Sequence, residues 1–114
     1  MYDYYGFPSE AYELKYPSES TAELRSIVKE SLLKEGYKLK SNTKRGYDHG
    51  VFIPLSIMYP EANIPVIQIS ILESLDPEEH FKMGKALREL KKDGFIIIGS
   101  GSSVHGGFGD KYAV

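Results

Sequence analysis

The sequence contains no cysteine and no tryptophan, and it carries little net charge. Without cysteine the chain can form neither a disulfide nor a thiolate metal site, so any metal must be held by His, Asp or Glu. A formal net charge of −2 gives no electrostatic footprint for nucleic acid. No apolar run approaches the roughly 20 residues of a membrane-spanning helix, and no signal peptide is recognised at the start. These absences favour a cytoplasmic protein that binds neither nucleic acid nor membrane.

The length of 114 residues suits a single domain with one modest hydrophobic core. Residues 1–17 are rich in aromatic side chains and include Pro8 and Pro17, which argue against a long helix. We interpret this stretch as an extended arm whose aromatic residues anchor on the rest of the domain. Residues 18–114 are then expected to form an α/β core within the same domain.

The first helix signal lies between Ser20 and Glu35, where apolar residues recur at helical spacing. Ser20 is the expected N-cap, and Glu23 can reach back to it to form a capping box. Gly36 follows the last periodic residue and is the natural C-terminal stop. The pattern predicts one helix with a single buried stripe.

The second helix signal is the sequence Asp-Pro-Glu-Glu at residues 76–79. It combines an N-cap, a proline at the first helical position and acidic residues in the first turn. The helix is expected to extend to about Asp93, with Gly94 as its stop. His80, in the first turn among charged residues, is expected at the surface. The expected buried side consists of Phe81, Met83, Leu87 and Leu90.

Three segments are predicted to be β-strands. Residues 37–40 alternate apolar and polar side chains, whereas residues 64–72 and 95–98 are mostly apolar and β-branched, as in strands buried on both faces. The last two flank the second helix and so predict a βαβ unit with parallel pairing and a right-handed crossover. The predicted fold class is α/β, with a small parallel or mostly parallel sheet and flanking helices.

The candidate catalytic residue is His49, within the sequence Arg-Gly-Tyr-Asp-His-Gly at residues 45–50. Imidazole gains or loses a proton near neutral pH, and the neighbouring Gly50 allows the backbone to approach a ligand closely. One interpretation is an acid–base group at the edge of the core. The other is a surface or hydrogen-bonded structural histidine in a loop. Pro54 is expected to open a short helical turn through Met58.

A glycine-rich loop at residues 99–109 follows the last predicted strand and contains His105. Ligands of open α/β sheets bind outside the carboxyl ends of the strands, so His105 is a candidate site residue. Such a loop can hold an anion with its backbone N–H groups, but this one has neither a dinucleotide fingerprint nor a G-x-S-x-G nucleophile elbow. We expect His49 and His105 to meet at one mouth of the sheet, and we expect no nucleotide cofactor.

Six short motifs occur in one order along the chain, at residues 4–8, 45–50, 54–55, 58–62, 64–66 and 99–105. In this order they resemble the class III extradiol ring-cleavage dioxygenases with a B-type catalytic subunit, in particular the DOPA 4,5-dioxygenase-like branch. The similarity extends from Tyr4 to about Gly106. It implies that the predicted sheet is a fragment of the fold of that B-type catalytic subunit.

The resemblance implies an enzyme that opens the ring of a catechol such as DOPA with O₂, using non-haem Fe(II) or Zn(II). The position matched by His49 is the family's acid–base histidine, and the position matched by His105 lies at the metal centre. The family usually has Asn where this chain has Gly106. Its main metal ligands belong to segments before and after this one, so we expect the chain to be the truncated, central part of a dioxygenase domain.

Two functions from different classes are open at this point. The first is an extradiol dioxygenase that obtains its missing ligands from a partner chain or a second copy, because such an iron site needs three protein ligands. The second is a catalytically inactive remnant that acts as a ligand-binding or protein-interaction module. A fragment of a larger sheet exposes unpaired strand edges, which favours a homo-oligomer or a complementing chain.

Overall fold

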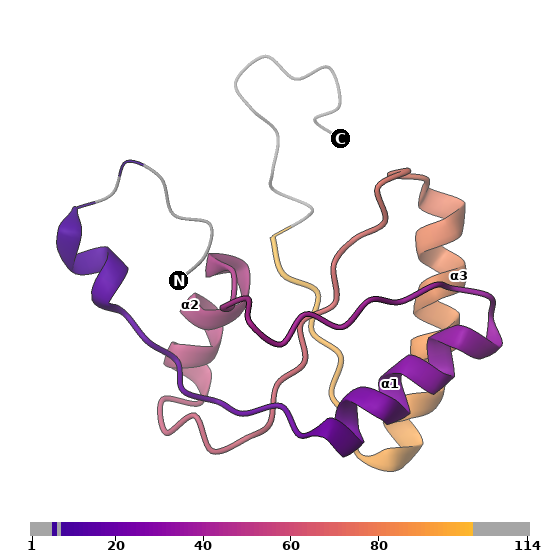
Figure 1. Cartoon of the computed structure of the whole chain (residues 1–114), viewed down its shortest axis with the longest axis horizontal. Helices are drawn as coiled ribbons and strands as arrows, with labels where there is room; N and C mark the ends of the chain where they lie inside the picture. Colours follow the sequence, from indigo (N-terminus) through magenta and orange to yellow (C-terminus); the bar gives the residue numbers. More distant parts are fainter. Residues whose placement is uncertain (1–5, 7, 102–114) are drawn as a thin grey trace.

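The computed structural model describes residue 6 and residues 8–101. Figure 1 shows helix α2 on one side and the crossing helices α1 and α3 on the other, with extended segments running between them. None of the helices in this part of the chain is long and apolar enough to cross a membrane. The helical elements are η1 (Ser9–Glu13), α1 (Ala22–Lys34), α2 (His49–Met58), α3 (Pro77–Arg88) and η2 (Glu89–Asp93).

Helix α1 forms where the apolar periodicity predicts it, but its N-cap is Thr21 rather than Ser20. The Thr21 hydroxyl accepts a hydrogen bond from the Leu24 N–H at 3.2 Å. The Ser20 hydroxyl instead accepts from the Arg25 guanidinium at 2.8 Å, so it is engaged elsewhere. Gly36 has φ +84°, the left-handed conformation predicted for the residue that ends this helix.

Helix α3 confirms the predicted Asp-Pro-Glu-Glu start. The Asp76 carboxylate accepts hydrogen bonds from the N–H groups of Glu78 at 2.8 Å and Glu79 at 3.4 Å. The α-helix is followed directly by the 3-10 helix η2, which ends at Gly94, whose φ is +83°. The start and end of this helix could be predicted from a few neighbouring residues, because local hydrogen bonds satisfy the free backbone groups at helix ends.

The core consists of two apolar clusters, one between α1 and α3–η2 and one around α2. Leu87 and Leu90 are buried as predicted, but the prediction for Phe81 is wrong, since it is 62% exposed. The Lys85 ammonium lies over its ring, 4.6 Å from the ring centroid. The α1–α3 cluster comprises Val28, Leu32, Ala86, Leu87 and Leu90. The α2 cluster comprises Tyr16, Phe52, Leu55 and Ala62.

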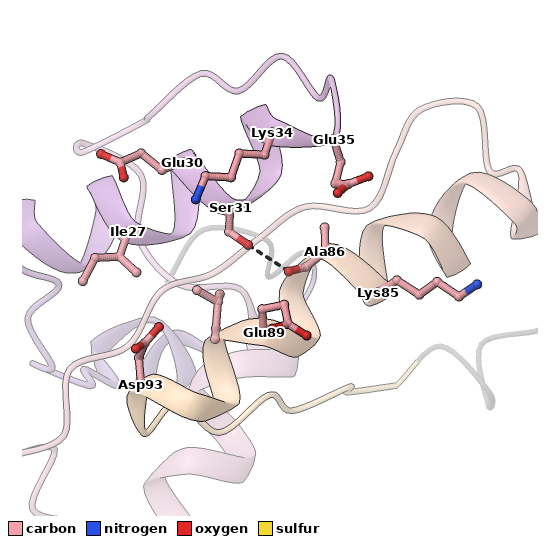
Figure 2. Close-up of a pocket in the computed structure, with 10 residues that line it drawn as sticks. Ile27, Glu30, Ser31, Lys34, Glu35, Lys85, Ala86, Glu89 and Asp93 are labelled. Atoms are coloured by element: carbon pink, nitrogen blue, oxygen red, sulfur yellow. Dashed lines mark hydrogen bonds between the residues drawn. The ribbon is translucent and has the colours of Figure 1, made fainter.

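A hydrogen bond from the Ser31 hydroxyl to the Ala86 carbonyl oxygen, 2.8 Å long, joins α1 to α3 (Figure 2). Beside it a groove of about 450 Å³ lies between the two helices. Charged side chains of both signs line this groove, as on an ordinary solvated surface, so we assign it no ligand. The charged residues are Glu30, Lys34, Glu35, Lys85, Glu89 and Asp93.

The predicted sheet is not confirmed. Residues 37–40, 64–72 and 95–98 contain no β-strand, and no backbone hydrogen bond joins these segments to one another. The predicted βαβ unit is therefore not formed within the described residues. The reason is that a strand needs a ladder partner, whereas an apolar pattern reports only a tendency to be buried. Ile96 is 76% exposed, so its segment is not buried on both faces as expected.

The segment 64–72 nevertheless alternates its side chains as a strand does. Val66 packs against the α2 cluster, whereas Ile67 and Ile69 pack against the α1–α3 cluster. Gln68 faces α2, where it binds Asp48. This period of two is the one that extended backbone imposes. The segment thus lies between the two helical groups.

Candidate active site

His49, the predicted catalytic residue, is the first residue of α2 rather than part of a loop, and it is half-buried. The preceding residue, Asp48, has extended backbone angles of φ −73° and ψ 159°. Its carbonyl oxygen accepts hydrogen bonds from the N–H groups of Val51 at 2.9 Å and Phe52 at 3.1 Å. These two bonds close the first turn of the helix and hold the His49 backbone within it.

Pro54 lies inside α2, whereas the sequence pattern placed it at the first helical position. A proline inside a helix costs about 3 kcal/mol, because it removes one hydrogen bond and its ring meets the carbonyl four residues earlier. That carbonyl belongs here to Gly50, in the first turn. Burial of Phe52 and Leu55 on the core side of α2 offsets the cost. Tertiary packing therefore extends the helix to the N-terminal side of its proline.

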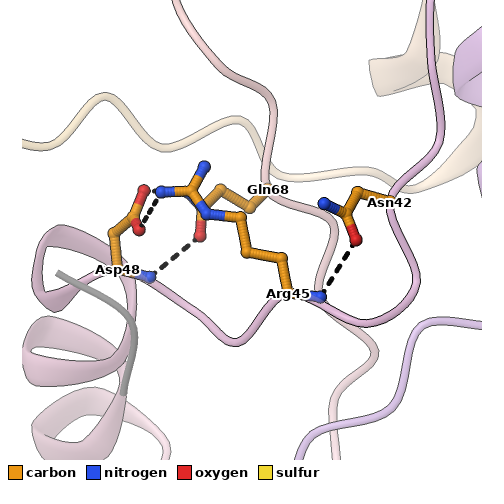
Figure 3. A network of polar contacts seen from close by, with 4 residues as sticks. All are labelled: Asn42, Arg45, Asp48 and Gln68. Atoms are coloured by element: carbon orange, nitrogen blue, oxygen red, sulfur yellow. Dashed lines mark hydrogen bonds and ion pairs between the residues drawn. The ribbon is translucent and has the colours of Figure 1, made fainter.

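A polar network fixes the residue that precedes His49 (Figure 3). The Arg45 guanidinium lies 2.5 Å from one Asp48 carboxylate oxygen, and the Gln68 amide N–H donates to the other. The Gln68 amide oxygen accepts from the Asp48 N–H at 3.1 Å. Because its carboxylate is held in this way, Asp48 makes no side-chain cap bond to α2. The network ties the start of α2 to the extended segment 64–72.

Tyr47 anchors the same turn on its other side. Its hydroxyl donates to the Val66 carbonyl oxygen at 3.0 Å and lies 3.3 Å from that of Ser18. Its ring meets the Tyr16 ring edge-on, with centroids 6.4 Å apart. Burial raises the pKa of the Tyr47 phenol, and Tyr16 adds to the rise. Tyr16 is itself buried and donates to the Tyr59 carbonyl oxygen at 3.0 Å, as expected for an aromatic anchor in the arm.

The start of the glycine-rich loop lies beside the start of α2. A Cβ atom at position 50 would lie 3.5 Å from the Ser100 hydroxyl oxygen, so Gly50 and Ser100 are neighbours. The loop therefore approaches the turn that carries His49. His105 lies outside the described residues, so its predicted meeting with His49 stays a prediction.

His80 has a structural role. Its Nε2 accepts a hydrogen bond from the Leu72 N–H at 3.0 Å, and its Nδ1 lies 2.6 Å from the Asp76 carbonyl oxygen. The side chain is partly buried rather than fully at the surface as predicted. It ties the first turn of α3 to the end of the extended segment, which leaves His49 as the candidate acid–base histidine in the described part of the chain.

Arg45, Asp48 and Gln68 were not predicted to act together. One signal was available for Gln68, which is the polar residue inside an otherwise apolar run at residues 64–69. A polar side chain in a buried segment needs a hydrogen-bond partner, so its position indicates a specific contact. The identity of that contact depends on tertiary structure, because Gln68 and Asp48 are distant in sequence.

Within the described residues, no three His, Asp or Glu side chains lie close enough together to hold a metal ion. Non-haem iron and zinc sites of catalytic type use three protein ligands. The described residues therefore do not fit a complete metal site. The chemistry that they can supply is proton transfer by His49 and hydrogen bonding by the groups around it.

Comparison with known families matches residues 1–113 to the catalytic LigB subunit of aromatic ring-opening dioxygenase. The 4,5-DOPA dioxygenase extradiol of Beta vulgaris is 45% identical over 106 residues, which are 92% of this chain and 40% of that protein. The dioxygenase tasH of Hapsidospora irregularis is 45% identical over 102 residues, which are 89% of this chain and 32% of that protein. The 4,5-DOPA dioxygenase extradiol of Escherichia coli is 35% identical over 105 residues, or 92% of this chain and 38% of that protein.

The chain thus spans between 32% and 40% of the length of these relatives. The matched family consists of metal-dependent dioxygenases. The match implies that the chain has the fold of this family, although no sheet is seen in the described residues. The resemblance to the class III extradiol dioxygenases is confirmed by a match over almost every residue. The chain therefore belongs to the family of the catalytic LigB subunit of aromatic ring-opening dioxygenase.

Proposed function

We propose that this chain is part of an aromatic ring-opening dioxygenase that cleaves a catechol such as DOPA with O₂. The observation that carries the proposal is the family match over residues 1–113. The relatives from Beta vulgaris and Escherichia coli are both named 4,5-DOPA dioxygenase extradiol, which favours DOPA or a similar catechol as substrate. The proposed compartment is the cytoplasm.

His49 is the proposed acid–base residue. A catechol hydroxyl must lose its proton before the ring can be opened, and an imidazole within hydrogen-bond distance can accept that proton and later return it. His49 lies in the first turn of α2, and Gly50 beside it has no side chain to block an approaching ring. The Arg45–Asp48–Gln68 network holds the preceding residue in place, so the imidazole is presented from a fixed backbone.

The proposed metal is Fe(II) or Zn(II), and His105 is proposed to lie at the metal site. The remaining ligands are proposed to come from residues other than those described, in a complementing chain or a second copy. This part of the proposal is supported by the metal dependence of the family and by the need for three ligands.

The test is a ring-opening assay on the 114-residue chain, alone and mixed with the remaining length of the Beta vulgaris relative produced separately. DOPA is supplied under air, the yellow ring-opened product is followed by absorbance, and iron and zinc are measured in each preparation. We expect product and bound metal in the mixture. Absence of both from every preparation would refute the activity.

His49→Ala should lower the ring-opening rate by roughly a hundredfold or more, because general acid–base groups contribute factors of that size. His80→Gln is the matched control, since His80 lies on α3 and its ring binds the backbone of Leu72 and Asp76. Bound metal should be the same in both variants. An unchanged rate in His49→Ala would remove the acid–base role while leaving the family's activity in place.

A binding or interaction module without turnover is the second candidate. The observation that favours it is the number of large apolar side chains that the described surface exposes, among them Ile57 on α2 and Ile71 and Ile96 in the extended segments. Calorimetric titration with DOPA under nitrogen separates the two candidates. Binding without product after air is admitted supports the module, whereas product formation supports the enzyme.

A further inference from the structure

The turn that leads from the extended segment 64–72 into α3 contains a strained residue (Figure 1). Leu75 has φ +52°, a left-handed conformation that residues with a bulky side chain rarely adopt. Leu75 is 66% exposed, so burial of its side chain does not hold the backbone in this conformation. Strain of this kind persists only where neighbouring contacts hold the backbone in place. The contacts across this turn therefore decide whether it stays closed.

The ring of His80 closes the turn, because it binds backbone groups on both sides of Leu75. Nε2 lies 3.0 Å from the Leu72 nitrogen and accepts its hydrogen, and Nδ1 lies 2.6 Å from the Asp76 carbonyl oxygen. A carbonyl oxygen can only accept a hydrogen bond, so Nδ1 carries a hydrogen; a backbone N–H can only donate, so Nε2 carries a lone pair. The two contacts together require the neutral ring with its hydrogen on Nδ1.

Uptake of a second proton removes one of these two bonds. The proton goes to Nε2, which then faces the N–H of Leu72, so two donors point at each other. The bond from Nδ1 to the Asp76 carbonyl oxygen is unaffected, so the loss falls on the Leu72 side of the turn. Imidazole is the side chain whose charge changes between about pH 5 and pH 8.

The other contacts of this turn do not change over the same range. The Asp76 carboxylate caps α3, and the Glu79 carboxylate accepts from the Ser74 hydroxyl at 2.6 Å. The Tyr37 hydroxyl donates to the Glu79 carbonyl oxygen at 2.9 Å. Carboxylates generally stay charged and phenols stay neutral between about pH 5 and pH 8. The charged or titratable groups in the segments that meet here, apart from His80, are Tyr37, Lys38, Glu73, Asp76, Glu78 and Glu79.

We propose that His80 is a pH-responsive latch for the turn at residues 72–76. With a neutral ring the latch is closed, and the turn holds Leu75 in its left-handed conformation. When Nε2 takes up a proton, the bond to Leu72 is lost and the strained turn opens locally. Because the bond needs the unprotonated nitrogen, it is present at the alkaline end of the range and is lost as the pH falls. The latch does not depend on ring-opening activity.

The test is NMR on the 114-residue chain. Nitrogen-15 shifts of the His80 ring at pH 8 should show a hydrogen on Nδ1 and none on Nε2. The exchange protection of the Leu72 amide, relative to an unfolded chain at the same pH, should fall at least about fivefold between pH 8 and pH 5, because one hydrogen bond is lost. The protection of the Leu32 amide in the α1–α3 cluster should not fall, since the opening is local.

Variants of the chain separate the charge of His80 from its shape. His80→Phe keeps a ring without nitrogen atoms, so Leu72 should already be unprotected at pH 8. His80→Gln cannot take up a proton, so the protection of Leu72 should be the same at both pH values. His49→Gln is the matched control, because it removes the other described histidine, on α2, and should leave the fall at Leu72 unchanged. Leu75→Gly should raise the protection at both pH values, since glycine takes this φ without strain.

Three results would overturn the proposal. The first is a hydrogen on Nε2 of His80 at pH 8, and the second is equal protection of Leu72 at pH 8 and pH 5 in the unaltered chain. The third is an undiminished fall in His80→Gln, which would assign the pH dependence to another group. If His80→Phe does not fold, the ring shifts and the Leu72 exchange of the unaltered chain still decide the question.

Discussion

Gln68→Ala is the substitution that most directly tests the network before His49. It removes the acceptor of the Asp48 N–H, which lies 3.1 Å from the Gln68 amide oxygen, and a donor to the Asp48 carboxylate. A neutral hydrogen bond contributes about 1 kcal/mol and one to a charged group about 1.5–3 kcal/mol. The Asp48 side chain is 26% exposed, so water replaces part of what is lost. We expect the free energy of unfolding to fall by about 1–3 kcal/mol in total.

The assay is urea unfolding followed by far-ultraviolet circular dichroism, since the chain has no tryptophan. The urea midpoint should fall with little change in slope, as for a loss of stability without a change in the surface exposed. Asp48→Ala and the double variant complete a cycle, and the coupling between the two sites should be about 0.5–3 kcal/mol. A coupling near zero would show instead that the two side chains stabilise the fold independently.

Three further predictions concern the packing, the partly buried phenol of Tyr47 and the backbone. Leu32→Ala should lower the free energy of unfolding by about 2–5 kcal/mol, measured in urea, since Leu32 is 1% exposed and its removal leaves a cavity. The raised pKa of Tyr47 means that the fold favours the protonated phenol; this stability is complete below the ordinary value of 10.0 and is lost as pH rises through the folded pKa. Alkaline unfolding of Tyr47→Phe should therefore lack that part of the pH dependence, and an unchanged profile would contradict it. Gly94→Ala should destabilise the chain because φ at this residue is +83°, whereas Gly84→Ala inside α3, where a Cβ meets nothing within 4 Å, should stabilise it by up to about 1 kcal/mol; thermal melting of the pair checks the opposite signs.

Helices α1 and α3 and the family could be predicted from the amino-acid sequence alone. Each helix was recognisable because its start and stop depend on neighbours in the chain, as in the Asp76 cap and the left-handed Gly36 and Gly94. Even there, the choice between Ser20 and Thr21 as N-cap depended on which hydroxyl the Arg25 side chain engaged. The family was recognisable because short motifs in a fixed order are a property of the sequence alone.

The start of α2, the contacts of Gln68 and the absence of β-strands among the described residues depend on contacts between distant segments. Pro54 is a start signal in isolation, but burial of Phe52 and Leu55 carries the helix further toward the N-terminus, to His49. Gln68 indicates only that it needs a partner, and the fold supplies Asp48. An apolar run such as 64–72 likewise predicts that its side chains are buried and alternate between two faces. It does not predict which segment pairs with it, because the hydrogen bonds of a sheet join two separate segments.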